Sequence, residues 1–222
     1  MSARSITVVG IDVGGTRKGL HGVALSRSTV VERCSSPDPA VLAAWCRQLG
    51  AELVAVDAPC RWRSGGPARL AERELMRAGI SCFVSPTREQ ALASRSGFYG
   101  WMLGGEALYG ELARQGYPLA QSAEELCRQR RCFETFPHAI TVQLHRALGL
   151  EPALAARKRP QRQALLERCG VDGRELRNID WIDAALCALA AQLLRDGAAC
   201  RTYGEADSGL VLVPAGLPAA AA

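Results

Sequence analysis

The sequence predicts an α/β fold in which a mixed five-stranded sheet is flanked by helices. Three short apolar segments separated by turns open the chain, as in consecutive antiparallel strands. A clearly delimited helix follows them. After it comes a purely apolar segment at residues 52–57, as expected of a strand buried on both faces. A strand that follows a crossover helix lies parallel to an earlier strand, so we expect residues 52–57 beside the first strand.

The N-terminal elements follow from apolar runs and from residues typical of turns and caps. The first three strands are expected at residues 6–12, 19–25 and 28–33, and two glycines after the first permit a tight turn. The helix has Asp38 as its N-cap, Pro39 at its first position and Gly50 just past its end.

The middle of the chain, about residues 60–130, is predicted to be a helical insertion. It begins with a loop that contains Arg61, Trp62 and Arg63. The pieces expected within it are a helix at 67–78, a strand-like stretch at 80–84, a mobile connection at 85–97 and an amphipathic helix with several glycines at 98–116.

The C-terminal part returns to the sheet and ends in helices. The fifth strand is expected at residues 131–135, with a helix from Pro137 to about Gly149. Later elements are a break at 156–160, a helix to Cys169, a helix at 179–195, extended pieces at 200–204 and 209–213, and a flexible tail at 214–222. We expect residues 1–222 to form a single domain, because no internal repeat is present.

Composition predicts a globular protein of the cytoplasm. The 222 residues are 48% hydrophobic, and no apolar run is long enough to span a membrane. No apolar signal segment precedes the first strand. The nine cysteines show no Cys-x-x-Cys spacing, which favours reduced thiols over a zinc site. The net charge is +5 and comes almost entirely from arginine; this suits a nucleic-acid partner, although compositional bias explains more of it.

Four aspartates stand where predicted elements end or begin. Asp12 and Asp57 close two apolar strands, and Asp180 and Asp183 open the last helix, three residues apart on one face. Carboxylates at the ends of parallel strands point into the crevice where ligands bind. Two carboxylates about 4 Å apart repel by about 4 kcal/mol at an effective dielectric near 20, so a shared site needs protons or divalent cations. Taken singly, the same residues suit turns and helix caps.

Glu134 is a fifth acidic candidate. It lies within a short apolar strand, where a carboxylate is costly unless it is paired or binds a ligand.

This order of acids resembles the ribonuclease H-like superfamily and, within it, the Holliday junction resolvases. The chain is more closely similar to the family called domain of unknown function 429, which is described as predicted ribonuclease H-like nucleases. The matching pieces are Gly10-Ile11-Asp12, Val56-Asp57-Ala58-Pro59, Glu134-Thr135-Phe136-Pro137, Lys158 with Arg162, and Asp180-x-x-Asp183-Ala184. In one respect the chain departs from the resolvases, since Asp57 stands where they usually have the longer Glu.

The resemblance implies a ribonuclease H-like fold and a divalent-metal-dependent nuclease that acts on DNA or RNA. Two Mg²⁺ or Mn²⁺ ions about 3.5–4 Å apart assist such hydrolysis. The implied metal ligands are Asp12 as the bridge, Asp57 and Asp183 with one ion each, and Asp180, which completes the shell. Glu134 is an additional acid, Lys158 and Arg162 are candidates to bind phosphate, and a junction enzyme would form a homodimer.

Two other classes of function stay open. Residues 11–16, Ile-Asp-Val-Gly-Gly-Thr, resemble the first phosphate loop of actin-like sugar kinases and ATPases, but the chain lacks a second such loop. The other alternative is a non-catalytic nucleic-acid-binding module whose acids serve only caps and turns. Such a module should place basic residues over the crevice, whereas the crevice-directed positions here are acidic.

Overall fold

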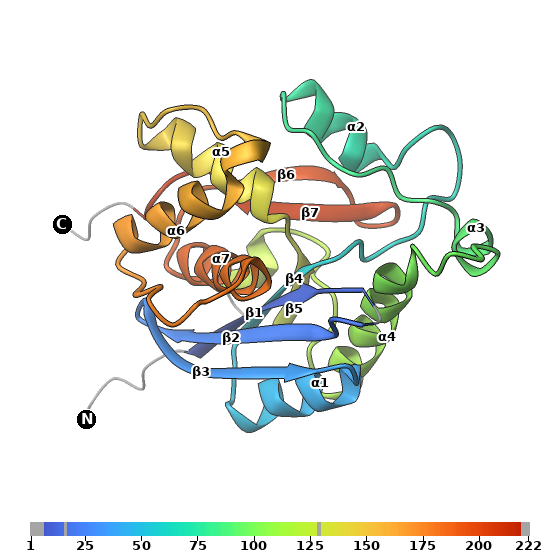
Figure 1. The fold of residues 1–222 in the computed structure, drawn as a ribbon, viewed down its shortest axis with the longest axis horizontal. Coiled ribbons are helices and arrows are strands. Elements are labelled where there is room, and N and C mark those ends of the chain that lie inside the picture. The colour runs from blue at the N-terminus through green and yellow to red at the C-terminus, as the bar shows by residue number, and fades with distance from the viewer. Residues whose placement is uncertain (1–6, 16, 128–129, 219–222) are drawn as a thin grey trace.

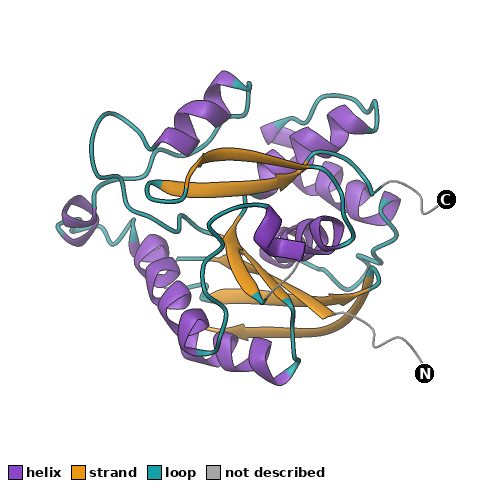
Figure 2. Cartoon of the chain, turned by 180° about the vertical axis from the view of Figure 1, so that it is seen from behind, coloured by secondary structure: helices purple, strands orange, loops and turns teal. Residues whose placement is uncertain are grey.

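The protein is a single mixed sheet with helices on both faces, as Figures 1 and 2 show in a computed structural model that describes residues 7–15, 17–127 and 130–218. The strands are β1 (Thr7–Val13), β2 (Leu20–Ser26), β3 (Thr29–Ser36), β4 (Leu53–Asp57), β5 (Arg131–Glu134), β6 (Cys200–Glu205) and β7 (Gly209–Pro214). The α-helices are α1 (Pro39–Gln48), α2 (Leu70–Arg77), α3 (Arg88–Leu92), α4 (Gly100–Arg114), α5 (Pro137–Ala147), α6 (Lys158–Arg168) and α7 (Ile179–Arg195). Two short 3₁₀ turns, η1 (Glu124–Cys127) and η2 (Ala155–Arg157), complete the set.

The strand order is β3-β2-β1-β4-β5-β7-β6. The pairs β1/β2 and β2/β3 are antiparallel, whereas β4 lies parallel to β1 and β5 parallel to β4. This arrangement of the first five strands is the ribonuclease H-like sheet, which confirms the predicted fold class. The two C-terminal extended pieces form an antiparallel pair that joins the same sheet beside β5, so the sheet has seven strands rather than five.

Two hydrophobic cores lie on opposite faces of this sheet because side chains alternate along each strand. Along β1, Val8 belongs to the core under α7, while Val9 belongs to the core under α1 and α4. Along β4, Leu53 and Ala55 face α7, and Val54 faces the other way. The last residues of β1 and β4 therefore have a predictable direction.

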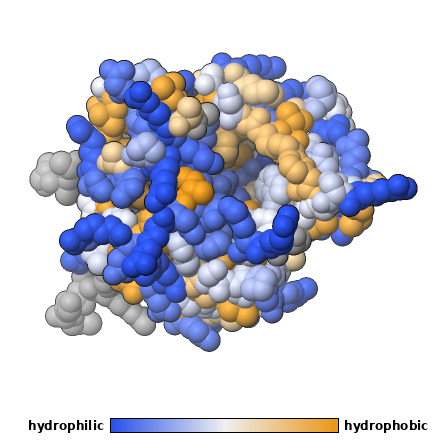
Figure 3. Space-filling model, viewed as in Figure 1, coloured by the Kyte–Doolittle hydropathy of each residue, from blue (hydrophilic) through white to orange (hydrophobic). Residues whose placement is uncertain are grey.

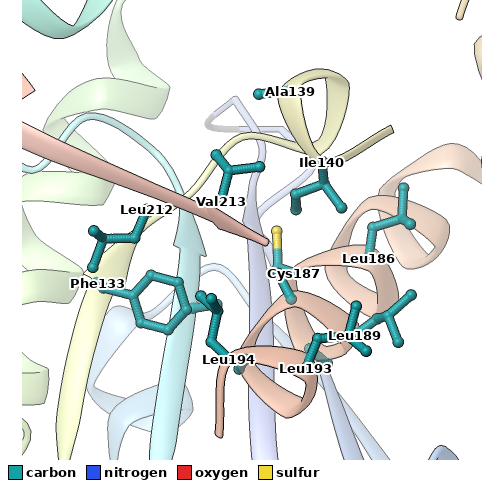
Figure 4. Packing of buried hydrophobic residues seen from close by; sticks show 14 of the residues in the cluster. Phe133, Ala139, Ile140, Leu186, Cys187, Leu189, Leu193, Leu194, Leu212 and Val213 are labelled. Atoms are coloured by element: carbon teal, nitrogen blue, oxygen red, sulfur yellow. The ribbon is translucent and has the colours of Figure 1, made fainter. Parts of the chain in front are cut away.

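Helix α7 crosses the sheet over β1, β2 and β4 and is apolar along most of its length. Figure 4 shows Cys187, Leu189, Leu193 and Leu194 packed among side chains from β5, α5 and β7. The closest approach is at Gly10, where an added Cβ would lie 2.1 Å from the Ala184 carbonyl oxygen and 2.1 Å from the Ala188 nitrogen. Only glycine permits this distance, because those atoms belong to the helix backbone.

Several predicted boundaries need correction. Residues 80–84 form no strand, since no described strand lies beside them, and the connection at 85–97 contains the short helix α3. Helix α6 begins at Lys158, within the predicted break; Pro160 fits its first turn, where the backbone N–H lacks a helical partner. The predicted tail begins one residue early, since Pro214 ends β7.

Some predicted features lie outside the described residues: the strand start at Ile6, Thr16 of the glycine turn, and residues 219–222 of the tail. No described helix has the length and hydropathy needed to cross a membrane.

Candidate metal centre

Asp12 and Asp57 are direct neighbours across the parallel pair β1/β4. Asp12 has the same strand parity as Val8 and Gly10, and Asp57 has the same parity as Leu53 and Ala55. Both carboxylates therefore point to the α7 face, at the carboxyl ends of their strands. The shorter side chain at position 57 still reaches its neighbours.

Asp183 approaches these two residues from the first turn and a half of α7. Asn178 is the N-cap of this helix and accepts a hydrogen bond from the Trp181 backbone N–H at 2.9 Å. Asn178, and neither Asp180 nor Asp183, therefore caps this helix. Asp12, Asp57 and Asp183 each offer a carboxylate oxygen, and these three oxygens lie within 4.8 Å of one another. We call these three residues the carboxylate cluster.

The cluster is electrostatically costly in its charged form. Burial raises the pKa of Asp12 to about 8, with further contributions from the charges of Asp183 and Asp180. Burial also raises the pKa of Asp57 well above its ordinary value, and the charges of Asp12 and Asp183 add to this. These directions mean that protons or cations must balance the cluster.

Some positive charge is already present beside it. Arg162 is buried in α6, and its Nη1 donates a hydrogen bond to Asp183 Oδ1. Burial raises the pKa of Asp183, whereas the charges of Arg162 and Lys158 lower it. The phosphate-binding candidates on α6 thus lie next to the cluster, and Arg162 is already paired with one of its members.

Asp180 takes a different partner. Its carboxylate accepts hydrogen bonds from Lys18 Nζ at 2.9 and 3.1 Å, and it stands outside the carboxylate cluster. Lys18 follows the glycine turn after β1, so this ion pair joins that turn to the start of α7. Lys18 is one of only two lysines in the chain, and this rarity is the one signal in the sequence that sets it apart.

Glu134 points to the opposite face of the sheet. It pairs in register with Val56, a member of the core under α1 and α4. Arg69 binds it through two hydrogen bonds of 3.0 and 2.6 Å, and the Cys60 backbone N–H donates to it at 2.8 Å. The buried guanidinium of Arg69 therefore balances the charge of Glu134, and it also pairs with Glu72 at 2.9 Å. Sequence reasoning did not identify Arg69.

His21 also lies near the carboxylate cluster. It pairs with Asp12 across β1/β2 and packs edge-on against Trp181, with ring centroids 4.8 Å apart. Burial lowers its pKa, which favours the neutral imidazole.

The donor set of the cluster suits a hard divalent cation. All three ligands are carboxylate oxygens, which Mg²⁺ and Mn²⁺ prefer, and no cysteine or histidine belongs to the group. The nine cysteines are free thiols distributed over the fold.

The chain matches a protein family and is similar to a solved structure. The family described as "Protein of unknown function (DUF429)" matches residues 10–208. A structure of RuvC from Thermus thermophilus is similar at 15% sequence identity and a TM-score of 0.45, with 86% of this chain and 97% of that chain covered. A search of curated proteins gives no match.

Proposed function

This chain belongs to the DUF429 family, and we propose that it is a divalent-metal-dependent nuclease that hydrolyses phosphodiester bonds at the carboxylate cluster. One observation carries the proposal: three aspartates from β1, β4 and α7 offer oxygens within 4.8 Å of one another. Asp12 and Asp57 have no hydrogen-bonding or ion-pair partner among the described side chains, which leaves their charge available to a cation.

Asp12, Asp57 and Asp183 would hold Mg²⁺ or Mn²⁺ through their carboxylate oxygens. Bound there, the ions supply charge stabilisation for a phosphodiester and lower the pKa of water. Asp180 orients the start of α7 through Lys18 and can complete the shell.

The remaining residues have supporting roles. Arg162 holds Asp183 in place and, together with Lys158, gives the α6 side of the site positive charge for a phosphate. Glu134 is a positioning residue, because its hydrogen bond to the Cys60 amide fixes the loop that follows Asp57.

The test is cleavage of labelled single-stranded, duplex and branched nucleic acids with Mg²⁺, Mn²⁺ or EDTA. We expect metal-dependent cleavage by the wild type and a loss of at least about 100-fold in Asp12→Asn, since a metal ligand is removed. Asp207→Asn, in the exposed β6–β7 turn, is the matched control and should retain full activity. Absence of cleavage with either metal, or equal cleavage by Asp12→Asn, contradicts the proposal. Release of phosphate from nucleotides instead would favour the kinase or ATPase class.

A further inference from the structure

Four aromatic side chains gather at the surface of the insertion. The rings of Phe83, Phe98, Tyr99 and Trp101 form what we call the aromatic cluster. Their centroids lie 5.9 Å apart for Phe83–Phe98, 5.8 Å for Phe83–Trp101 and 5.1 Å for Phe98–Tyr99. Phe83 is 44% exposed and Phe98 is 59% exposed, although large aromatic side chains are normally covered. The cluster therefore presents ring faces and edges to solvent.

Exposed apolar side chains concentrate in the same segment. Five of the nine large exposed apolar residues of the described chain fall between positions 76 and 98: Met76, Phe83, Val84, Leu92 and Phe98. Figure 3 shows a band of apolar surface on the side of the molecule where α2 lies in Figure 1. A contiguous exposed patch of this kind marks an interaction surface.

The aromatic cluster shares a pocket with Asp57, one member of the carboxylate cluster. The residues that line this pocket include Asp57, Phe83, Trp101 and Phe136, together with the buried ion pair Arg69–Glu134. Its volume of about 70 Å³ is small compared with the cavity of about 150 Å³ that holds a benzene ring. A planar ring of substrate would thus lie on the aromatic cluster rather than enter the pocket, and the strand that carries it would pass Asp57.

The chain segment that carries the aromatic cluster is rich in positive charge. Residues 60–99 contain seven arginines, no lysine and three glutamates, a net charge of +4, compared with +5 for the whole chain. Four of these arginines, Arg61, Arg73, Arg77 and Arg95, are exposed and pair with no carboxylate among the described residues. Arginine combined with aromatic faces is the pattern by which proteins bind the backbone and the bases of a single strand.

We infer that the insertion binds single-stranded nucleic acid, whose unpaired bases stack on Phe83 and Phe98 while arginines of residues 60–99 contact its phosphates. This inference rests on the proposed nuclease function and names its substrate class. In a duplex the base faces are covered by their neighbours, so only an unpaired stretch can use the aromatic cluster.

The test measures binding without cleavage. Asp12→Asn protein in EDTA is titrated against fluorescent oligonucleotides, single-stranded or as the duplex of the same sequence, and anisotropy gives the Kd. We expect tighter binding of the single strand. Adding Phe83→Leu and Phe98→Leu keeps the apolar volume but removes the rings, and should weaken single-strand binding about tenfold or more.

Two controls separate stacking from folding and charge. Leu154 is also an exposed apolar side chain, 50% exposed, but it lies outside residues 60–99. Leu154→Ala should therefore leave the Kd for the single strand unchanged. Arg95→Gln should lower the slope of log K against log salt by about 0.7, because one phosphate contact to a single strand is lost, whereas Arg201→Gln in β6 should not.

Each outcome is decisive. An unchanged Kd in the Phe83/Phe98 variant, or a preference for duplex, overturns the inference while metal-dependent cleavage would still support the nuclease. If single-strand binding depends on the rings but the protein cleaves no substrate, the proposed nuclease activity is wrong and the binding role of the aromatic cluster stands. If sedimentation shows that wild-type protein self-associates and the double variant does not, the aromatic cluster is a contact between copies of the chain and the inference is wrong.

Discussion

Replacing Asp12 by Asn should stabilise the metal-free protein at pH 8. The folded-state pKa of Asp12 is raised to about 8, first by burial and then by the charges of Asp183 and Asp180. An aspartate in the unfolded chain titrates near pH 3.9. Between these values the folded protein binds more protons than the unfolded chain, so stability falls as the pH rises through this window. Asparagine has the same shape and does not ionise, which removes the penalty.

The size of the effect follows from the pKa difference. About four units at 1.36 kcal/mol each set an upper limit of about 5 kcal/mol at pH 8. Asp57 and Asp183 remain in the variant, and their own ionisation adjusts once residue 12 is neutral. We therefore expect a gain in the free energy of unfolding below this limit, of about 1 kcal/mol or more. For a chain of this size, about 1 kcal/mol raises Tm by about 2–4 °C. Near pH 4 both forms are neutral at this position and the gain should vanish.

The assay is thermal unfolding at pH 4, 6 and 8, with EDTA or with Mg²⁺. In EDTA the Tm difference between Asp12→Asn and wild type should grow with pH, while Asp207→Asn shows no such trend. Mg²⁺ at 100 times its Kd should raise the free energy of unfolding of the wild type by about 2.7 kcal/mol, and its Tm should rise accordingly. The Tm of Asp12→Asn should rise much less. A variant that is less stable than wild type at pH 8 in EDTA, or a difference independent of pH, would refute the electrostatic reasoning.

Two further substitutions test what positions the site. Gly10→Ala should destabilise the protein by about 2 kcal/mol or more in urea unfolding, because the added Cβ would lie 2.1 Å from backbone atoms of α7. The control is Gly110→Ala, where the added Cβ meets no atom within 4 Å. This change should instead stabilise the protein by about 0.5–1 kcal/mol, because alanine favours the helix α4. Equal effects of the two would contradict the close packing of β1 and α7. Arg69→Met should cost about 3–5 kcal/mol because it leaves the buried Glu134 unpaired, and adding Glu134→Gln should recover part of that loss; two additive losses in the double-mutant cycle would contradict the ion pair.

The central part of the site was predictable from the sequence because strand ends are easy to recognise. Asp12 and Asp57 each close an apolar run, and one crossover helix between those runs implies parallel neighbours. The register that places them side by side follows directly from that pairing. Asp183 was predictable as the acid that opens an apolar helix, although only the glycine at position 10 explains how closely that helix approaches.

The partners of the other acids could not be predicted in the same way. Whether Glu134 faces the cluster depends on the register of β5 against β4, and a four-residue strand carries too little pattern to fix it. Its partner Arg69 comes from the insertion, far along the chain, and one arginine among many gives no signal. The pairing of Asp180 with Lys18 likewise depends on the path of a glycine turn.

The structural acids Glu134 and Glu72 differ from the carboxylate cluster in how their charge is balanced. Where this fold buries a carboxylate for structure, it supplies a guanidinium: Arg69 bonds both Glu134 and Glu72. In the cluster only Asp183 receives such a partner, Arg162, and the described residues offer none to Asp12 and Asp57. Those two lie side by side because strand pairing places them there, and their pKa values are raised first by burial and then by the charges of the neighbouring aspartates. A site held together by backbone geometry and left short of positive charge supports the proposal that these carboxylates bind a cation.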